Sequence, residues 1–269
     1  MAQAKEQLPE MTFWDHLDDL RGVLIRMFVT VALAAVVLFC FMPTIFDQVI
    51  LAPCRGDFVL YRVFSKITAH IPGAPAFDTD FTVNLINIKL ASQFFIHMST
   101  SCWLAVVLTF PLILYYLWGF VAPALYSNER RGVKTAFGTG VLMFFVGVAV
   151  GYFVVFPVTL RFLADYHVSA MVPNQISLDS YMDTFMMLLL VMGVVFELPL
   201  LSWLLGNVGL LHREFFARYR RHAVVGLLVL AAFITPTGDP FTLTIVFLPI
   251  YVLYEFSALL VKPQPAIEE

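Results

Sequence analysis

Charged residues are scarce in this sequence. They make up 13% of its 269 residues, whereas hydrophobic residues make up 60%, and the mean hydropathy is +0.85. Soluble domains are roughly 45–50% apolar and about 25% charged, so the composition excludes an ordinary soluble protein. The 16 Lys and Arg residues do not outnumber the 19 Asp and Glu residues, and the absence of a basic excess argues against a nucleic-acid partner. The composition is that of a protein in a lipid bilayer.

Cysteines are few, and known catalytic motifs are absent from the sequence. Cys40, Cys54 and Cys102 are odd in number and have no metal-ligand spacing, so they predict neither a disulfide framework nor a zinc site. We interpret them as packing residues. The sequence contains no P-loop, no H-E-x-x-H, no G-x-S-x-G and no nucleotide fingerprint. We therefore expect a protein that is not an enzyme and that has no cofactor and no metal.

Long runs without charge predict an all-α, polytopic membrane protein. A transmembrane helix needs about 20 largely apolar residues. Runs that satisfy this need, or are interrupted by one or two acids at most, cover residues 27–46, 90–128, 135–160, 184–212 and 223–261. The turn at residues 235–240 divides the last run in two. We therefore predict six transmembrane helices, of which the fifth and sixth are short.

The distribution of Lys and Arg predicts the orientation. Basic residues favour the cytoplasmic side, and 11 of the 16 fall in the terminal segments and in the loops after the second and fourth spans. Both termini are therefore expected in the cytoplasm. The first 21 residues lack the apolar region of a cleaved signal peptide. The predicted organisation is one integral membrane domain, 1–269, with a cytoplasmic amphipathic segment at 1–21, outer loops at 47–89 and 161–183, and cytoplasmic loops at 122–134 and 207–222.

Two acidic residues on the predicted cytoplasmic face are candidates for binding. Asp19 lies in a segment whose spacing predicts an amphipathic helix, and Glu129 precedes Arg130 and Arg131. A solvated acidic face for Asp19 and a local ion pair for Glu129 are the plainer interpretations. Together, however, the two carboxylates would suit a ligand with paired cations, because guanidinium and carboxylate groups form two parallel charge-assisted hydrogen bonds.

Glu197 is an acidic residue inside an otherwise charge-free run, residues 184–212. It lies deep in the fourth predicted span, where a charge costs at least about 2.5–3.5 kcal/mol on insertion scales. A proton relay, a polar contact for another transmembrane helix and a satisfied interior acid are all compatible with this position. Each requires a partner, water or a retained proton.

Other polar and small residues have simpler interpretations. Asp239 lies in the outer turn, where it is expected to cap a helix. Glu255 is expected to pair with a base near the cytoplasmic end of the sixth span. Gly147 and Gly151 have the spacing of a small-xxx-small pair, which we expect to allow close helix packing within the bundle. In the outer loops we expect a short helix near residues 58–67 and a helix cap at Ser177 or Ser180.

Five segments together resemble one protein family. They are His16-Leu17-x-Asp19-Leu20-Arg21, Trp118-x-Phe120-x-x-Pro123-Ala124-Leu125-Tyr126-x-x-Glu129-Arg130-Arg131, Tyr152-Phe153-x-x-Phe156-Pro157, Phe196-Glu197-x-Pro199, and Thr235-Pro236 with Asp239. In this order, over nearly the whole chain, they resemble TatC, the multispanning receptor subunit of the twin-arginine protein translocase.

The resemblance implies a function and a set of site residues. It implies a receptor in the bacterial inner membrane that binds twin-arginine signal peptides of folded proteins and draws on the proton-motive force. It assigns Asp19 and Glu129 to the twin arginines, with Leu17, Phe120 and Arg21 shaping that patch. It assigns Glu197 to contact with the single-span subunits TatA and TatB, and leaves a possible outer-turn role for Asp239. Further copies of the chain are expected in the receptor complex.

Two alternatives remain open from the residues themselves. Glu197 and the proline-interrupted spans would also suit a proton-coupled small-solute transporter. The sequence lacks the repeated halves that such transporters usually show, and one acid makes a short relay. A purely structural scaffold is the other alternative, and it predicts that Glu197 can be replaced without loss of partner binding.

Overall fold

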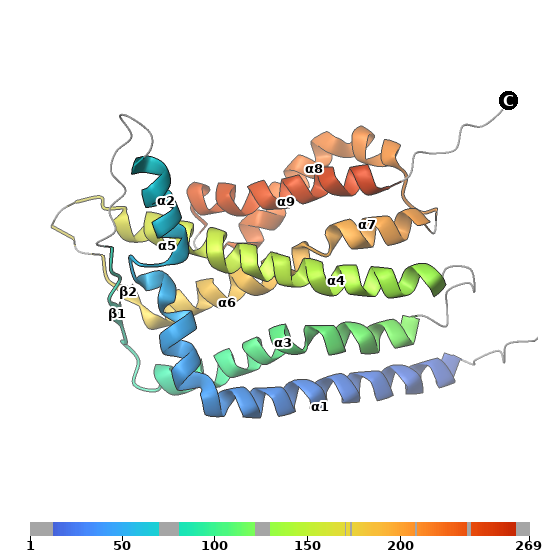
Figure 1. Ribbon diagram of the computed structural model, residues 1–269, viewed down its shortest axis with the longest axis horizontal. Helices are drawn as coiled ribbons and strands as arrows, with labels where there is room; N and C mark the ends of the chain where they lie inside the picture. Colours follow the sequence, from blue (N-terminus) through green and yellow to red (C-terminus); the bar gives the residue numbers. More distant parts are fainter. Residues whose placement is uncertain are drawn as a thin grey trace, which may run out of the picture.

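The computed structural model describes residues 13–69, 81–121, 130–169, 171–172, 174–207, 209–235 and 238–261. Long helices lie side by side along one direction, and a cap of short elements closes one end (Figure 1). The long helices are α1 (Phe13–Ile45), α3 (Ser92–Val121), α4 (Arg130–Val150), α6 (Leu178–Val195), α8 (Arg213–Ile234) and α9 (Pro240–Leu260). The shorter helices are α2 (Val59–Ala69), α5 (Phe156–Asp165) and α7 (Leu198–Asn207). Strands β1 (Leu85–Ile86) and β2 (Ile176–Ser177) form a parallel pair in the cap.

The predicted helical membrane architecture is confirmed. Within the described ranges, five segments are long and apolar enough to cross a membrane: Leu17–Cys54, Ser92–Phe120, Phe137–Asp165, Leu178–Asn207 and Pro240–Leu260. Helix α8 is not among them, because its first turns carry several Arg residues and its charge-free part, residues 223–234, rises only about 18 Å. Helix α9 is longer than predicted for the last span, since its 21 residues rise about 32 Å.

Several boundaries differ from the sequence prediction. The expected interfacial segment at residues 1–21 is, from Phe13 onward, the beginning of α1, which continues without a break to Ile45. In the second outer loop, α5 extends to Asp165 and α6 begins at Leu178, so the non-helical part is shorter than 161–183. The short helix expected near residues 58–67 is confirmed as α2.

Helix irregularities occur in or next to three of the expected spans. A π-helical turn, η4 (Gly151–Val155), joins α4 to α5, and another, η1 (Phe46–Ile50), extends α1. The fourth span is divided at Phe196 and Glu197 into α6 and α7. Pro199 explains the division, because a proline inside a helix lacks the backbone donor and clashes with the carbonyl four residues earlier. The expected long fourth helix is therefore two helices.

Helices α4 and α6 approach one another closely in the centre of the bundle. A Cβ atom on Gly147 would lie 2.5 Å from the backbone oxygen of Met192, and one on Gly193 would lie 2.7 Å from the Phe144 ring. Gly151 also faces α6, because a Cβ atom on Gly151 would lie 3.4 Å from Leu188 O. The prediction that Gly147 and Gly151 serve packing within the bundle is confirmed.

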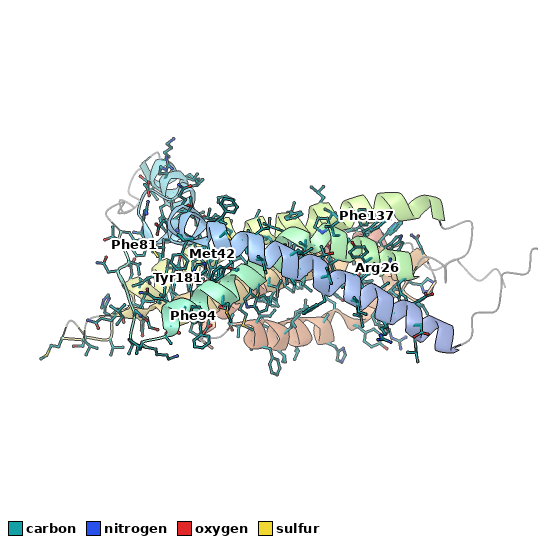
Figure 2. All side chains as sticks on the ribbon, turned by 90° about the horizontal axis from the view of Figure 1, so that it is seen from below. Arg26, Met42, Phe81, Phe94, Phe137 and Tyr181 are labelled. Atoms are coloured by element: carbon teal, nitrogen blue, oxygen red, sulfur yellow. The ribbon has the colours of Figure 1, made fainter. Side chains whose placement is uncertain are left out.

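The apolar core is concentrated in the half of the bundle next to the cap. It includes Met42, Phe156, Tyr181 and Met182, all at most 2% exposed. Figure 2 shows Met42, Phe81, Phe94 and Tyr181 towards this end, and Arg26 and Phe137 towards the other. Large apolar side chains also cover the outside of the bundle, as with Phe28 on α1, which is 75% exposed. Such an outer surface is expected where lipid is the solvent.

Candidate functional site

The first candidate site lies at the end of the bundle opposite the cap. Here α1 begins, α3 ends at Val121 and α4 begins at Arg130 (Figure 1). Asp19 and Arg21 on α1 are exposed, and Leu17 beside them is 39% exposed. These side chains are available to a ligand at this end.

Phe120 and Glu129 belong to the neighbouring helix ends. Phe120 is half-buried in the last turn of α3, and α1 packs against α3. Glu129 lies outside the described residues, directly before the first residue of α4. The two helix ends that flank residues 122–129 lie at the same end of the molecule as the beginning of α1 (Figure 1). Asp19 and Phe120 therefore lie towards the same end of the bundle. The end of α3 and the beginning of α4, which flank the segment that contains Glu129, lie at this end too.

Glu197 forms the second candidate site, inside the bundle. It is 9% exposed and lies between α6 and α7, where its backbone N–H donates to Val194 O at 3.0 Å. Its side-chain Oε1 is buried and makes no hydrogen bond to the described residues. Oε2 faces Gly140 of α4, because a Cβ atom on that glycine would lie 3.2 Å from it. The missing side chain at Gly140 leaves room for the carboxyl group.

The Oε1 atom of Glu197 is buried without a hydrogen-bond partner among the described residues. A buried polar group without a hydrogen-bond partner costs about 1–3 kcal/mol. Among the described residues, Glu197 is the only buried acidic or basic side chain, so the structure shows no second carboxylate beside it to form a relay. A hydrogen-bond donor from outside the chain would remove the cost.

The remaining acids have partners of their own. Glu255 forms an ion pair with Arg220 of α8 and accepts a hydrogen bond from the Tyr251 hydroxyl at 2.8 Å, which confirms the predicted pairing with a base. Asp239 is the N-cap of α9, and its Oδ1 accepts from Thr242 N at 2.7 Å. Capping therefore explains Asp239 in the outer turn.

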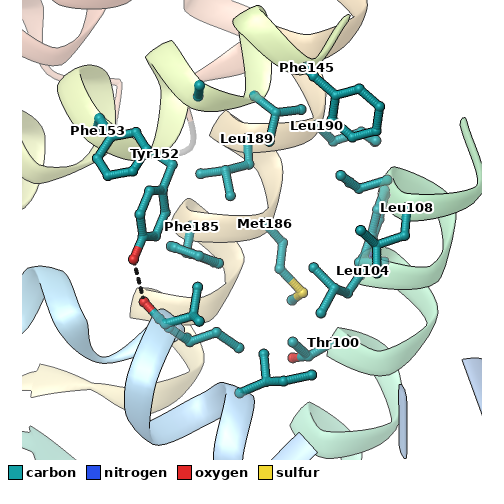
Figure 3. Close-up of a pocket in the computed structure, with 17 residues that line it drawn as sticks. Thr100, Leu104, Leu108, Phe145, Tyr152, Phe153, Phe185, Met186, Leu189 and Leu190 are labelled. Carbon is teal, nitrogen blue, oxygen red and sulfur yellow. Dashed lines mark hydrogen bonds between the residues drawn. The ribbon is translucent and has the colours of Figure 1, made fainter. Parts of the chain in front are cut away.

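An apolar cavity was not predicted from the sequence. It has a volume of about 320 Å³ and lies between the end of α1 and helices α3, α4 and α6 (Figure 3). The described residues that line it include no charged side chain. The Tyr152 hydroxyl donates to Val49 O at 2.8 Å, whereas Thr100 Oγ1 is buried and has no hydrogen-bond partner in the described part of the chain. This lining offers contacts to an apolar group and supplies no catalytic acid or base.

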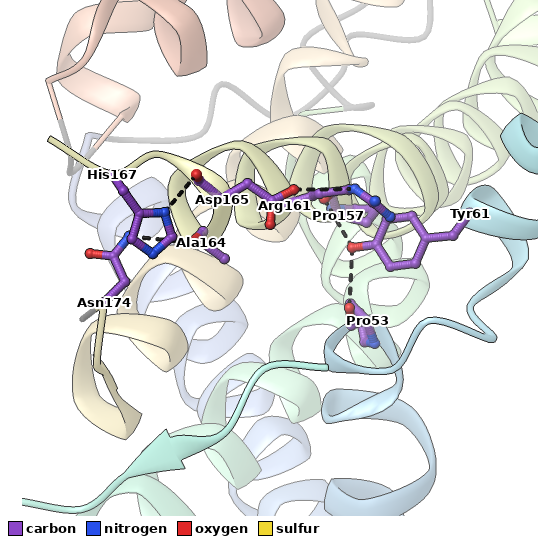
Figure 4. A network of polar contacts seen from close by, with 8 residues as sticks. All are labelled: Pro53, Tyr61, Pro157, Arg161, Ala164, Asp165, His167 and Asn174. Carbon is purple, nitrogen blue, oxygen red and sulfur yellow. Dashed lines mark hydrogen bonds and ion pairs between the residues drawn. The ribbon is translucent and has the colours of Figure 1, made fainter. Parts of the chain in front are cut away.

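A polar network in the cap was also missed by the sequence analysis (Figure 4). Tyr61 of α2 is buried, and its hydroxyl donates to Pro53 O at 3.2 Å and to Pro157 O at 3.1 Å. Burial raises the pKa of Tyr61 above its ordinary value. The Arg161 guanidinium lies 5.4 Å from the centre of the Tyr61 ring and 3.5 Å from Asp165. The aromatic residues near 58–61 were the available signal, since buried tyrosines usually have hydrogen-bond partners.

The fold defines an all-helical, multi-pass membrane protein, and comparison with known proteins identifies its family. Residues 15–249 match the model for "Sec-independent protein translocase protein (TatC)". The TatC protein of Blattabacterium from Periplaneta americana is 32% identical over 255 residues, covering 94% of this chain and 96% of the relative. The Escherichia coli K12 TatC protein is 37% identical over 175 residues, covering 64% of this chain and 66% of the relative.

A solved structure supports the same assignment. The crystal structure of the twin-arginine translocase receptor TatC superposes with a TM-score of 0.72 at 27% identity, covering 91% of this chain and 97% of the other. The chain therefore belongs to the TatC family of protein translocase subunits. Membership of this family of transport receptors agrees with the prediction that the chain is not an enzyme.

Proposed function

We propose that this chain is the receptor of a bacterial twin-arginine translocation system in the inner membrane. It binds the signal peptide at the end of the bundle where α1 begins, which is the cytoplasmic end when both termini are inside. The charge-free part of α8 completes six spans, with the short fifth span crossing a locally thinned bilayer at a modest cost. The chief support is family membership, combined with the beginning of α1, which carries Asp19, lying at the same end of the bundle as the helix ends that flank Glu129.

The binding step follows from charge and geometry. Asp19 is exposed on α1, and a carboxylate accepts two parallel hydrogen bonds from one guanidinium group. We assign the second arginine to Glu129, and contacts with the rest of the peptide to Leu17 and Phe120. We assign Arg21, which is also exposed on α1, to the border of this patch.

A binding measurement tests this assignment. The full chain, reconstituted in nanodiscs, is titrated with a labelled twin-arginine signal peptide. Asp19→Asn and Glu129→Gln should each weaken binding at least about tenfold, since a charge-assisted contact at a partly exposed site contributes roughly 1.5–3 kcal/mol. Asp18→Asn is the matched control, because Asp18 is also exposed on α1 but points about 100° away from Asp19. Equal affinity for all variants would refute the assignment.

We further propose that Glu197 is the contact for the membrane helices of TatA and TatB. Its unpaired Oε1 atom supports this proposal, because a donor on a partner helix would satisfy it. The same proposal includes transport driven by the proton-motive force. It also includes further copies of the chain in the receptor complex. A proton-coupled transporter is less well supported, since no second buried carboxylate lies among the described residues.

A further inference from the structure

Helix α2 presents an apolar stripe to its surroundings at the capped end of the bundle. Val59, Val63, Phe64 and Ile67 are 40–50% exposed. In a helix with 3.6 residues per turn, these four residues fall within an arc of about 140°. We call them the α2 stripe. A surface helix of a soluble domain would turn such a stripe towards its own core.

The opposite side of α2 is attached to the protein. Tyr61 is 1% exposed and is held by its hydrogen bonds to Pro53 O and Pro157 O. Phe58, just before the helix, packs against the Tyr152 ring at 5.6 Å and the Phe153 ring at 6.0 Å. These contacts fix the rotation of the helix, so the stripe faces outward.

The position of α2 corresponds to the surface of the bilayer. The first candidate span ends at Cys54, and α2 begins five residues later, at Val59. The axis of α2 runs across the direction of the long helices in Figure 1, and Figure 2 shows it nearly end-on. A helix perpendicular to the spans at their end lies parallel to the membrane plane.

Basic residues border the stripe on one side. Arg62 and Lys66 are both exposed, and helical spacing places them about 40° apart, next to Val59 and Val63. Interfacial helices have this arrangement, with apolar residues at the acyl boundary and Lys or Arg at the level of the headgroups. Anionic phospholipids supply the complementary charge.

We propose that α2 is a lipid-docking helix, with the α2 stripe inserted at the acyl boundary and Arg62 and Lys66 bound to phosphates of anionic phospholipids. The helix thereby fixes the depth of the cap relative to the spans. The site is at the opposite end of the bundle from Asp19, so this inference is independent of the signal-peptide assignment.

Depth-dependent fluorescence quenching tests the proposal on the full chain. Cys40→Ser, Cys54→Ala and Cys102→Ser provide a background for single-cysteine labels at Val63→Cys and Ile67→Cys, with Asp57→Cys as the control at an exposed position just before α2. The chain is reconstituted in phosphatidylcholine vesicles with or without phosphatidylglycerol. Labels at 63 and 67 should be quenched by nitroxide-labelled lipid and protected from iodide, whereas the label at 57 should show the reverse.

Each other outcome overturns a stated part of the proposal. Iodide quenching at 63 and 67 equal to that at 57 would place the stripe in water. Protection from both quenchers would mean that protein covers the stripe, either residues 70–80 or a second copy of the chain. Phosphatidylglycerol should increase nitroxide quenching at 63, and the double variant Arg62→Gln/Lys66→Gln should lose that increase. No effect of phosphatidylglycerol would refute the phosphate contacts. Two label positions keep the test valid if one variant does not fold.

Discussion

The carboxyl groups of this chain differ in the interactions that surround them. Glu255 has an ion pair and a tyrosine hydroxyl, and Asp239 has the backbone N–H of Thr242. Both are satisfied within the chain, which identifies them as structural residues. Glu197 is buried, and its Oε1 has no partner within the described ranges, whereas Asp19 is exposed. At the scale of single residues, Glu197 and Asp19 are therefore the two of these four acids that are available to a partner.

The ion pair between Arg220 and Glu255 links α8 to α9. We expect Arg220→Met to lower the free energy of unfolding by about 1 kcal/mol or less, because both side chains are partly exposed and solvent weakens their attraction. Thermal unfolding in detergent measures the change. Arg221→Met, at the next exposed position, should have a smaller effect. A larger loss for Arg221→Met would show that the pair does not contribute.

The Tyr61 hydroxyl provides a second prediction. Tyr61→Phe should destabilise the protein by about 1–2 kcal/mol, because it removes the one hydroxyl donor that Pro53 O and Pro157 O share. Since burial raises the pKa of the folded tyrosine, its contribution is complete below the pKa of the unfolded chain, about 10, and decreases as the pH rises above it. Melting temperatures of the two proteins should therefore converge above pH 10. A difference that grows with alkaline pH would contradict this explanation.

At the scale of elements, the contact between α4 and α6 depends on glycine. Gly147 is opposite the backbone of α6, and backbone cannot move aside as a flexible side chain can. The small-xxx-small spacing was readable from the sequence, but the partner helix was not. Spacing on one helix defines a face, whereas the element that packs on this face depends on the arrangement of the whole bundle.

Two glycines on α4 allow a matched comparison. Gly147→Ala should destabilise the chain by about 1–3 kcal/mol, because the added Cβ would lie 2.5 Å from Met192 O. Gly138→Ala should be neutral or stabilise by up to about 1 kcal/mol, because nothing lies within 4 Å of its Cβ position and alanine favours the helix. Thermal unfolding of the two variants tests the prediction. Equal effects would mean that the helix contact is not tight at Gly147.

The sequence predicted the helices better than their interruptions. Charge-free runs located the five candidate spans of the described residues. Of the two candidate caps, Ser177 and Ser180, Ser177 is the cap of α6, since its side chain accepts from Ser180 N. The division at Glu197 was missed, although Pro199 was visible, because a span in lipid can contain a proline without ending. The lengths of α8 and α9 were also not readable, since the position of Arg213 inside a helix depends on where that helix starts.

At the scale of the whole molecule, the two ends of the bundle have different surfaces. The end where α1 begins carries exposed polar residues such as Asp19 and Arg21, whereas the other end is closed by the cap around Tyr61. Sequence alone placed Asp19 and Glu129 on one face through the distribution of Lys and Arg. It predicted the short helix α2 but not the contacts that assemble the cap, because the Tyr61 hydroxyl contacts Pro157 O, which lies 96 residues later in the sequence.

If Glu197 contacts the partner helices as proposed, stability and assembly should respond in opposite directions to its replacement. Glu197→Leu should raise the free energy of unfolding of the isolated chain by about 1–3 kcal/mol, because it removes a buried unpaired carboxyl group at similar side-chain volume. The same change should reduce co-purification of TatA and TatB, because the donor on the partner helix loses its acceptor. Glu197→Gln retains an acceptor oxygen and should keep more of the partner. If Glu197→Leu leaves both partners bound, the carboxyl group is only a structural cost, and its presence needs another explanation.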